Sequence, residues 1–329
     1  MSVLALLVIA GCGSGSAPHV ALSGDSASFV RAAPDRPRLA PPGSCYGAAA
    51  AVPGHVCDDP RFATMVYPAP RVAPSIISPS PCRTTVVSHL VRACWWGARA
   101  ARAQRTVALI GDSHASVWRP AFERVIHARH WRAVSISRAG CPLTLARPRF
   151  TMGGSEVSCM IWNHQVLRWV ARHRQVSVVF LAAHPGHVIP RGNQTFMAAK
   201  RAGYAASIRG LLRAGVAHVV VLRDTPRNPS TTTTCIEGAL ATHRPPGPAC
   251  AVPRAFALRT DPLVVAARAF RAPRVAVVDL SRLWCGAASC PPVIGGVLVL
   301  RDGHHMTDAF SSTLGPFLLR AVDVLARRW

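Results

Sequence analysis

The chain has 329 residues, half of them hydrophobic, and carries a formal net charge of +24. This length is sufficient to bury a full core in one large domain or two small ones. The charge comes from arginines scattered among alanine and proline, with Lys200 as the only lysine and no nucleic-acid-binding motif, which argues against a nucleic-acid partner.

The first twelve residues form an apolar segment that ends at Cys12. Ile9-Ala10-Gly11-Cys12 resembles a bacterial lipobox, in which the cysteine is lipid-modified after cleavage. The run is too short to span a bilayer and lacks the positive residues of a signal peptide. Three interpretations stay open: the true start lies upstream, the resemblance is accidental, or the stretch is the tail of a transmembrane helix. All of them place the rest of the chain outside the membrane, secreted or membrane-anchored.

The composition of the rest of the sequence, residues 13–329, changes at about residue 82. Residues 13–81 are rich in Pro, Ala, Gly and Ser, which predicts a linker or a loosely ordered arm. Residues 82–329 alternate between predicted strands and helices: strands at 106–110, 132–137, 176–182, 217–222, 274–279 and 297–301, and helices at about 116–130, 163–174, 195–214, 261–271 and 307–327. This alternation predicts an α/β fold, a doubly wound parallel sheet flanked by helices.

One long excursion interrupts the alternation. Residues 224–254 contain a run of threonines, two prolines in tandem and the pair Cys235 and Cys250. We predict that this stretch crosses the carboxyl edge of the sheet, either as a disulfide-braced surface loop or as a segment that shapes access to a site there.

The strand 106–110 ends abruptly in Gly111-Asp112-Ser113-His114. A buried strand that stops at a glycine turn exposes the next side chains at the carboxyl edge of the sheet, where ligands of open α/β sheets bind. Ser113 is therefore a candidate nucleophile, or alternatively a helix cap without chemistry. Asp112 is predicted to cap the following helix or brace the turn, and His114 either shapes the site or is solvated.

A base and its orienting group follow the predicted strand at 297–301. Asp302 and His305 lie three residues apart, close enough for one turn to present both side chains together. The carboxylate would fix the imidazole tautomer through Nδ1 and leave Nε2 free to take a proton from Ser113. His304 adjoins the same turn and competes with His305 for the role of base. No spacing typical of a metal site is found, and no metal or cofactor is expected.

These residues resemble motifs of the SGNH hydrolase superfamily, close to the SGNH domain associated with bacterial cell-envelope acyltransferase 3 proteins. Gly111-Asp112-Ser113-His114 and the Asp302/His305 pair resemble its first and fifth blocks, and residues 137–144 resemble its second. Ser158-Cys159 with Trp162-Asn163 resembles its next cysteine segment, and residues 285–307 resemble its C-terminal signature. The resemblance extends from about Cys82 to the end and implies an SGNH/flavodoxin-like three-layer sandwich.

The resemblance also implies roles for particular residues. Ser113 would be the nucleophile, His305 the general base and Asp302 the orienting carboxylate. The backbone N–H groups of Ser113 and Gly140 would form an oxyanion hole. The asparagine usual in the third block is missing from residues 176–187, so the third donor stays open among three candidates: His184, Asn163 and Asn193.

Eleven cysteines indicate the compartment. With Cys12 set aside, the other ten fall in order into five local pairs: 45/57, 82/94, 141/159, 235/250 and 285/290. Sequence alone does not prove connectivity. Pairs that bracket loops, without metal spacing, nevertheless favour disulfides and an extracytoplasmic location.

Together these observations predict a serine esterase or O-acyltransferase that acts through an acyl-serine intermediate. The resemblance implies short-chain esters, above all acetyl esters, of a cell-wall or surface glycan as substrates. It also implies a membrane acyltransferase as acyl donor, expected to be a separate protein because the sequence shows no series of membrane spans. The alternative is a catalytically inactive SGNH-fold module that binds glycan or partners a membrane acyltransferase, which the missing third-block asparagine favours.

Overall fold

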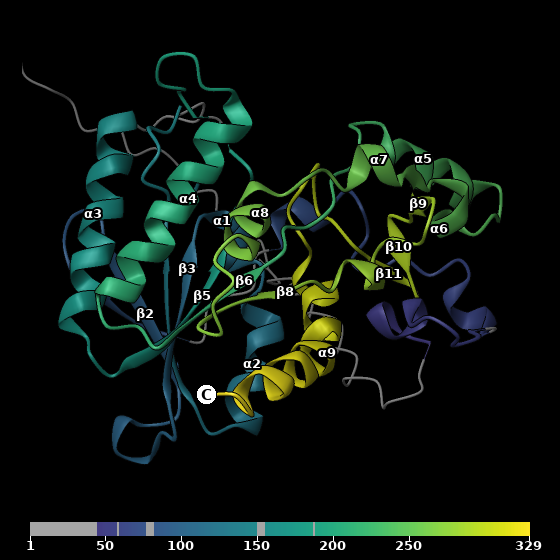
Figure 1. Ribbon diagram of the computed structural model, residues 1–329. Coiled ribbons are helices and arrows are strands. Elements are labelled where there is room, and N and C mark those ends of the chain that lie inside the picture. The colour runs from purple at the N-terminus through teal and green to yellow at the C-terminus, as the bar shows by residue number, and fades with distance from the viewer. Residues whose placement is uncertain (1–44, 58, 77–81, 150–154, 187) are drawn as a thin grey trace, which may run out of the picture. The chain divides into compact units, whose positions relative to one another are not determined.

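A computed structural model describes residues 45–57, 59–76, 82–149, 155–186 and 188–329 (Figure 1). The proposed lipobox at Cys12 lies outside the described residues.

The core of the domain is a seven-stranded sheet in the order β1-β2-β4-β3-β5-β6-β8. Five strands run parallel and match the predicted strands closely: β3 (Thr106–Gly111), β4 (Arg132–Ser137), β5 (Val176–Ala182), β6 (His218–Leu222) and β8 (Val275–Val278). The sequence analysis missed two antiparallel strands at one edge, β1 (Arg83–Val86) and β2 (Arg92–Gly97). The sheet is therefore mostly parallel rather than wholly parallel.

Helices cover both faces of this sheet, as predicted for a doubly wound fold (Figure 1). Alternate β3 residues point to opposite faces: Val107 and Leu109 join one buried cluster, Ala108 and Ile110 the other. On the first face lie α2 (Arg119–Ala128) and α9 (Asp308–Ala326), and on the second α3 (Glu156–Arg172), α4 (Phe196–Arg213) and α8 (Pro262–Arg268). The architecture is the predicted three-layer sandwich.

The last helix has the length and composition of a membrane span, but it is a packed element of the domain. Phe310, Leu314, Leu318 and Val322 recur along one face of α9 and are fully buried in the cluster that includes α2.

Two predicted elements differ from the structure for identifiable reasons. The predicted helix 116–130 is split into α1 (Ser113–Ser116) and α2, and Pro120 lies in the first turn of α2, where its missing N–H costs no helical hydrogen bond. The predicted strand 297–301 is not part of the main sheet. Its first residues form β11 (Val297–Leu298), which pairs with β10 (Val293–Ile294), because Gly295 and Gly296 both adopt positive φ and close a tight hairpin.

The described residues before Cys82, 45–57 and 59–76, pack onto the domain, although the composition of residues 13–81 predicts a linker. They contain the short 3-10 helices η1 (Gly47–Ala51), η2 (Pro60–Phe62) and η3 (Ala73–Ser75). Tyr46 and Ala48 are buried in the same cluster as α9, and the N–H of Gly47 donates to the carbonyl of Gly295 at 3.0 Å. A few well-placed apolar residues therefore anchor a segment that is otherwise rich in proline and alanine.

The excursion at 224–254 is also more ordered than a loop. It contains α5 (Thr232–Ala241), α6 (Pro246–Ala249) and β7 (Val252–Pro253). β7 pairs with β9 (Ser289–Cys290), and α7 (Arg254–Ala257) follows it directly. Ile236 and Ala239 of α5 pack with Ala73 and Leu298 in a third buried cluster. Two further 3-10 helices complete the described elements: η4 (Ala100–Arg102) and η5 (Ser281–Leu283).

Five disulfides join the ten described cysteines in the order in which the sequence pairs them. They are Cys45–Cys57, Cys82–Cys94, Cys141–Cys159, Cys235–Cys250 and Cys285–Cys290. Each closes a loop of 5 to 18 residues, so the bridges stiffen connections within the domain.

Gly111 is required at the end of β3 because a neighbouring backbone lies too close for a side chain. A Cβ at this position would lie 1.8 Å from the carbonyl oxygen of Ala182 on β5. We expect Gly111→Ala to destabilise the domain by about 1–3 kcal/mol, the usual cost of forcing an extra carbon into a packed site. Chemical denaturation measures this change.

Gly238→Ala is the matched control, because Gly238 lies within α5 and a Cβ added there would meet nothing within 4 Å. The control is expected to stabilise the helix by about 0.5–1 kcal/mol. Equal effects of the two substitutions would contradict the close approach at Gly111.

Candidate active site

The turn after β3 places Ser113 at the carboxyl edge of the sheet. Asp112 caps α1, because its Oδ1 accepts the backbone N–H of His114 at 2.8 Å. Its carboxylate also accepts the backbone N–H of His184, 3.0 Å from Oδ2. Asp112 thus braces the turn, as the sequence predicts. Burial raises its pKa to about 6.

Ser113, His305 and Asp302 form a continuous hydrogen-bonded chain. Ser113 Oγ lies 2.8 Å from His305 Nε2, and His305 Nδ1 lies 2.8 Å from Asp302 Oδ2. The other carboxylate oxygen, Oδ1, accepts the backbone N–H groups of His304 and His305 at 2.9 and 2.8 Å. The turn at 302–305 therefore presents the carboxylate and the imidazole on the same side.

The electrostatics around Asp302 and His305 suit a base at His305. Burial opposes ionisation of Asp302, but hydrogen bonds from the His305 ring and from two backbone N–H groups outweigh it and lower the pKa of Asp302 below its usual value. An ionised Asp302 holds the proton of His305 on Nδ1. Nε2 is then left unprotonated toward the hydroxyl of Ser113, which is the arrangement needed to accept its proton.

A second chain of polar groups runs beside the first. His114 Nδ1 lies 2.5 Å from Asp224 Oδ1, and His114 Nε2 lies 2.9 Å from His304 Nδ1. The hydroxyl of Thr225 donates to the carbonyl of His304 at 2.7 Å. Burial raises the pKa of Asp224 and lowers those of His114 and His304 to about 4, so both imidazoles are neutral at pH 7.

This second chain separates the roles of the two adjacent histidines. The ring of His304 faces His114, whereas the ring of His305 faces Ser113. His304 is therefore held by its neighbours, and His305 is the histidine placed to act on Ser113.

The proposed oxyanion donors lie at the same edge of the sheet. Ser113 is the first residue of α1, so its N–H has no acceptor within the helix. Gly140 lies in the turn after β4, where φ is +65°, and β4 pairs with the end of β3 through Gly111 and Ser137. The structure thus brings both backbones to one end of adjacent strands.

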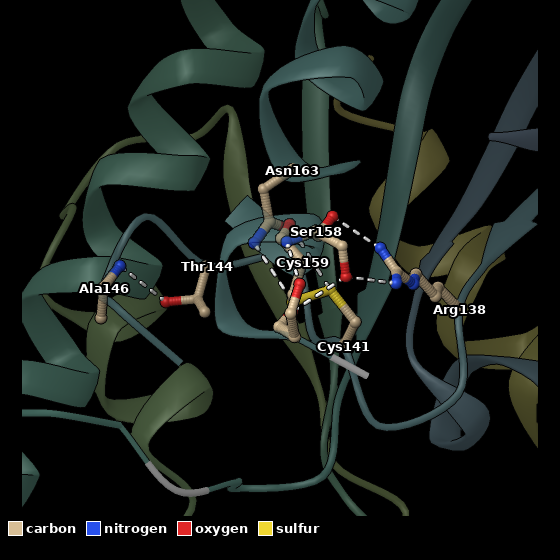
Figure 2. Close-up of a disulfide and its surroundings, with 8 residues drawn as sticks. Arg138, Cys141, Thr144, Ala146, Ser158, Cys159 and Asn163 are labelled. Carbon is tan, nitrogen blue, oxygen red and sulfur yellow. Dashed lines mark hydrogen bonds between the residues drawn. A yellow bond between two sulfur atoms is a disulfide. The ribbon is translucent and has the colours of Figure 1, made fainter. Parts of the chain in front are cut away.

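The three candidates for the third donor lie in different places. The ring of His184 is 4.8 Å from that of His114 and 4.9 Å from that of His304, and burial lowers its pKa to about 3. Figure 2 shows Asn163 beside the Cys141–Cys159 disulfide, where its Nδ2 lies 3.8 Å from the sulfur of Cys159. Among the described residues, no hydrogen bond joins Asn163 or Asn193 to Ser113, His305 or Asp302. Of the three candidates, His184 is the one whose side chain contacts the histidines beside Ser113 and His305.

The histidines also bring potential metal ligands together. Among the described residues, ligand atoms of His114, His184 and His304 lie within 4.8 Å of one another, as do those of Asp302, His304 and His305. Hydrogen bonds already engage both nitrogens of His114 and both of His305. A metal would have to break the chain from Asp302 to Ser113 or the chain from Asp224 to His304, so the geometry fits proton transfer better than metal binding.

The sequence analysis missed Asp224 and Thr225 as members of this site. Both lie within three residues of the end of β6, at the same edge of the sheet as Ser113. The sequence carries a signal for these residues, because polar residues just after a buried parallel strand are the same pattern that identified Ser113.

His114→Phe is expected to destabilise the protein. The substitution removes both hydrogen bonds of the imidazole and leaves the buried carboxyl group of Asp224 with Thr225 as its remaining donor. The loss of the imidazole partner costs about 1–3 kcal/mol. His127→Phe is the matched control, because His127 is exposed on α2, and surface changes are usually within about 0.5 kcal/mol. Chemical denaturation of both variants tests this, and equal stabilities would contradict a structural role for the Asp224–His114 pair.

Comparison with known proteins identifies the family of this chain. A family model described as "SGNH domain (fused to AT3 domains)" matches residues 81–320. Because the match covers well over half of the chain, the protein belongs to this family of SGNH domains.

Among solved structures, the chain is similar to the periplasmic domain of a lipopolysaccharide acetyltransferase from Salmonella ser. Paratyphi A. The TM-score is 0.50 and the sequence identity 14%, over 68% of this chain and 85% of that chain. At this identity the similarity shows a shared fold. A search of curated proteins found no match.

Proposed function

We propose that this protein is an extracytoplasmic serine esterase or O-acyltransferase that acts through an acyl-serine intermediate. The observation that carries the proposal is the chain from Asp302 through His305 to Ser113, with both hydrogen-bond distances at 2.8 Å. The most suitable substrates are short-chain, above all acetyl, esters of a cell-envelope glycan. Support for this class comes from the SGNH family and its association with acyltransferase domains.

The first step forms the acyl-enzyme. Ser113 Oγ attacks the ester carbonyl carbon while His305 Nε2 takes the hydroxyl proton, and Asp302 stabilises the imidazolium that results. The bond to the leaving alcohol then breaks, and His305 returns the proton to the alcohol oxygen. The acyl group remains on Ser113.

The second step transfers the acyl group onward. Water or a sugar hydroxyl attacks the acyl-serine carbonyl, His305 accepts the proton of the attacking group, and that proton returns to Ser113 Oγ. Water as acceptor gives hydrolysis, and a sugar hydroxyl gives transfer. In both steps the N–H groups of Ser113 and Gly140 would stabilise the oxyanion, with His184 as the proposed third donor.

The cellular setting follows from the disulfides and the family. Five disulfides suit an oxidising compartment outside the cytoplasm. The solved neighbour is itself a periplasmic domain. The proposed acyl donor is a membrane acyltransferase, since the family is described as fused to such domains, and the proposed acceptor is a surface glycan.

The test supplies the purified protein with a chromogenic acetyl ester, with and without a saccharide acceptor. Release of the chromophore together with free acetate indicates an esterase. Release together with an acetylated saccharide, detected by mass spectrometry, indicates a transferase. Absence of turnover with every ester would overturn the enzymatic proposal and favour a non-catalytic glycan-binding module.

A further inference from the structure

A cavity of about 640 Å³ adjoins the catalytic centre on the side of His184 and His304. This volume is typical of a small-molecule site. The cavity is formed by the ends of β5 and β6, by α4 and by the residues that lead into α8. Its charged walls include four cationic side chains: Lys200, Arg223, Arg227 and Arg259.

Most of these cations lack an acidic partner. Among the described residues, Lys200, Arg227 and Arg259 form no salt bridge, and Arg223 reaches Asp279 only at 3.5 Å. The guanidinium of Arg227 is held in place instead by the carbonyl of Phe256, at 2.9 Å from Nε, and by the Phe256 ring. Three of the four positively charged groups around this cavity thus have no salt-bridge partner among the described residues.

Among the described residues, the two carboxyl groups in the wall form no salt bridge with these cations. Asp224 contacts His114 and Thr225, and Asp261 accepts the backbone N–H groups of Asp224, Leu263 and Val264. Both are buried, and burial raises the pKa of each, that of Asp261 to about 6. Burial and the like charge of Arg259 lower the pKa of Arg227, as expected for two guanidinium groups that share a space without an anion.

We propose that this cavity binds an anionic group, a carboxylate or a phosphate, on the saccharide that carries the reacting ester or hydroxyl. The inference rests on the proposed function, because it assigns a substrate class to the same site. Guanidinium groups suit both anions, since each presents parallel N–H donors to two oxygens. His304 lines the cavity and is next in sequence to His305, whose ring contacts Ser113, so a sugar whose anionic group is held here lies beside the proposed reacting groups.

The test compares acetyl esters of three sugars: methyl glucoside, glucuronic acid and glucose 1-phosphate. We expect the kcat/KM of the wild-type protein to be at least about tenfold higher for an anionic ester than for the neutral one, the usual scale of a charge-assisted hydrogen bond. Higher values for both anionic esters indicate a general anion site, and a preference for one identifies carboxylate or phosphate. Equal values for all three would overturn the proposal.

Variants locate the effect in the cavity. Arg227→Gln and Arg259→Gln are each expected to raise KM for the anionic ester about tenfold, a larger rise than for the neutral ester. Arg209→Gln, an exposed arginine on α4 outside the cavity, is the matched control. Arg259 is exposed, so its variant keeps the test valid even if Arg227→Gln fails to fold. An unchanged KM in the Arg259 variant, or an equal loss in the control, would contradict the assignment.

Direct binding separates this inference from the proposed function. Isothermal titration of trigalacturonate and of glucose 1-phosphate into Ser113→Ala measures the cavity without turnover. Binding of either probe that weakens about tenfold in Arg259→Gln supports the cavity even if no ester is hydrolysed. Binding of neither, alongside normal hydrolysis of neutral esters, would overturn the anion site and leave the esterase proposal intact.

Discussion

Ser113→Ala is expected to lower kcat for acetyl-ester hydrolysis by at least about 10³-fold, because no other described hydroxyl lies against His305 Nε2. The substitution removes the atom that forms the acyl-enzyme and leaves the binding surfaces in place. KM should therefore change little. Steady-state kinetics with a chromogenic acetyl ester measure both constants, and mass spectrometry of the quenched reaction should show the acetyl group on wild-type Ser113 alone.

Ser116→Ala is the matched control for this prediction. Ser116 lies on the same short helix, but its hydroxyl donates to Ser137 Oγ at 2.8 Å rather than facing a histidine. Its variant should retain most of the activity. Turnover that survives in Ser113→Ala at the wild-type rate would remove Ser113 from the mechanism.

His305→Gln should reduce kcat by a similar factor, at least about 10³-fold, whereas His304→Gln should reduce it far less. His305 is the imidazole in contact with both Ser113 and Asp302. His304 contacts His114 and supports the turn, so its loss affects only the positioning of its neighbour. Comparing the two variants is informative because the same substitution is made at two adjacent positions of one turn.

The same kinetic assay decides between them. A larger loss in His304→Gln than in His305→Gln would contradict the assignment of the base. Circular dichroism and thermal denaturation of both variants show whether either loss comes from unfolding instead of chemistry.

The proposed catalytic residues could be singled out in the sequence because each follows a simple local signal. Ser113 comes at the end of a buried parallel strand, and Asp302 and His305 share one turn. The family motifs predicted that a serine and a histidine 192 residues apart would meet, and the two side chains lie 2.8 Å apart. The strand before His305, however, belongs to the β10–β11 hairpin and not to the main sheet, so a shared sheet edge does not explain the contact. The choice between His304 and His305, by contrast, depends on which ring faces His114, and that contact depends on tertiary packing.

The parts that the sequence analysis missed depend on long-range packing. Asp224 acquires its role only because β6 ends near His114. The segment 45–76 lacks any periodic pattern, and its burial rests on isolated residues such as Tyr46 that fit against distant helices. Composition alone cannot distinguish such an anchored segment from a free linker, because the same prolines and alanines suit both.

The contact between Tyr67 and the β10–β11 hairpin affects how this protein should be trimmed for experiments. Tyr67 donates its N–H to Gly296 and accepts that of Leu298, both at 2.9 Å, and the strand it supports leads straight to Asp302. A recombinant fragment cut to the family-matched region would lack this support and would also stop inside α9. Loss of activity in such a fragment would reflect the loss of these stabilising contacts and not the absence of catalytic residues. Expression boundaries should therefore lie upstream of Cys45 and downstream of α9.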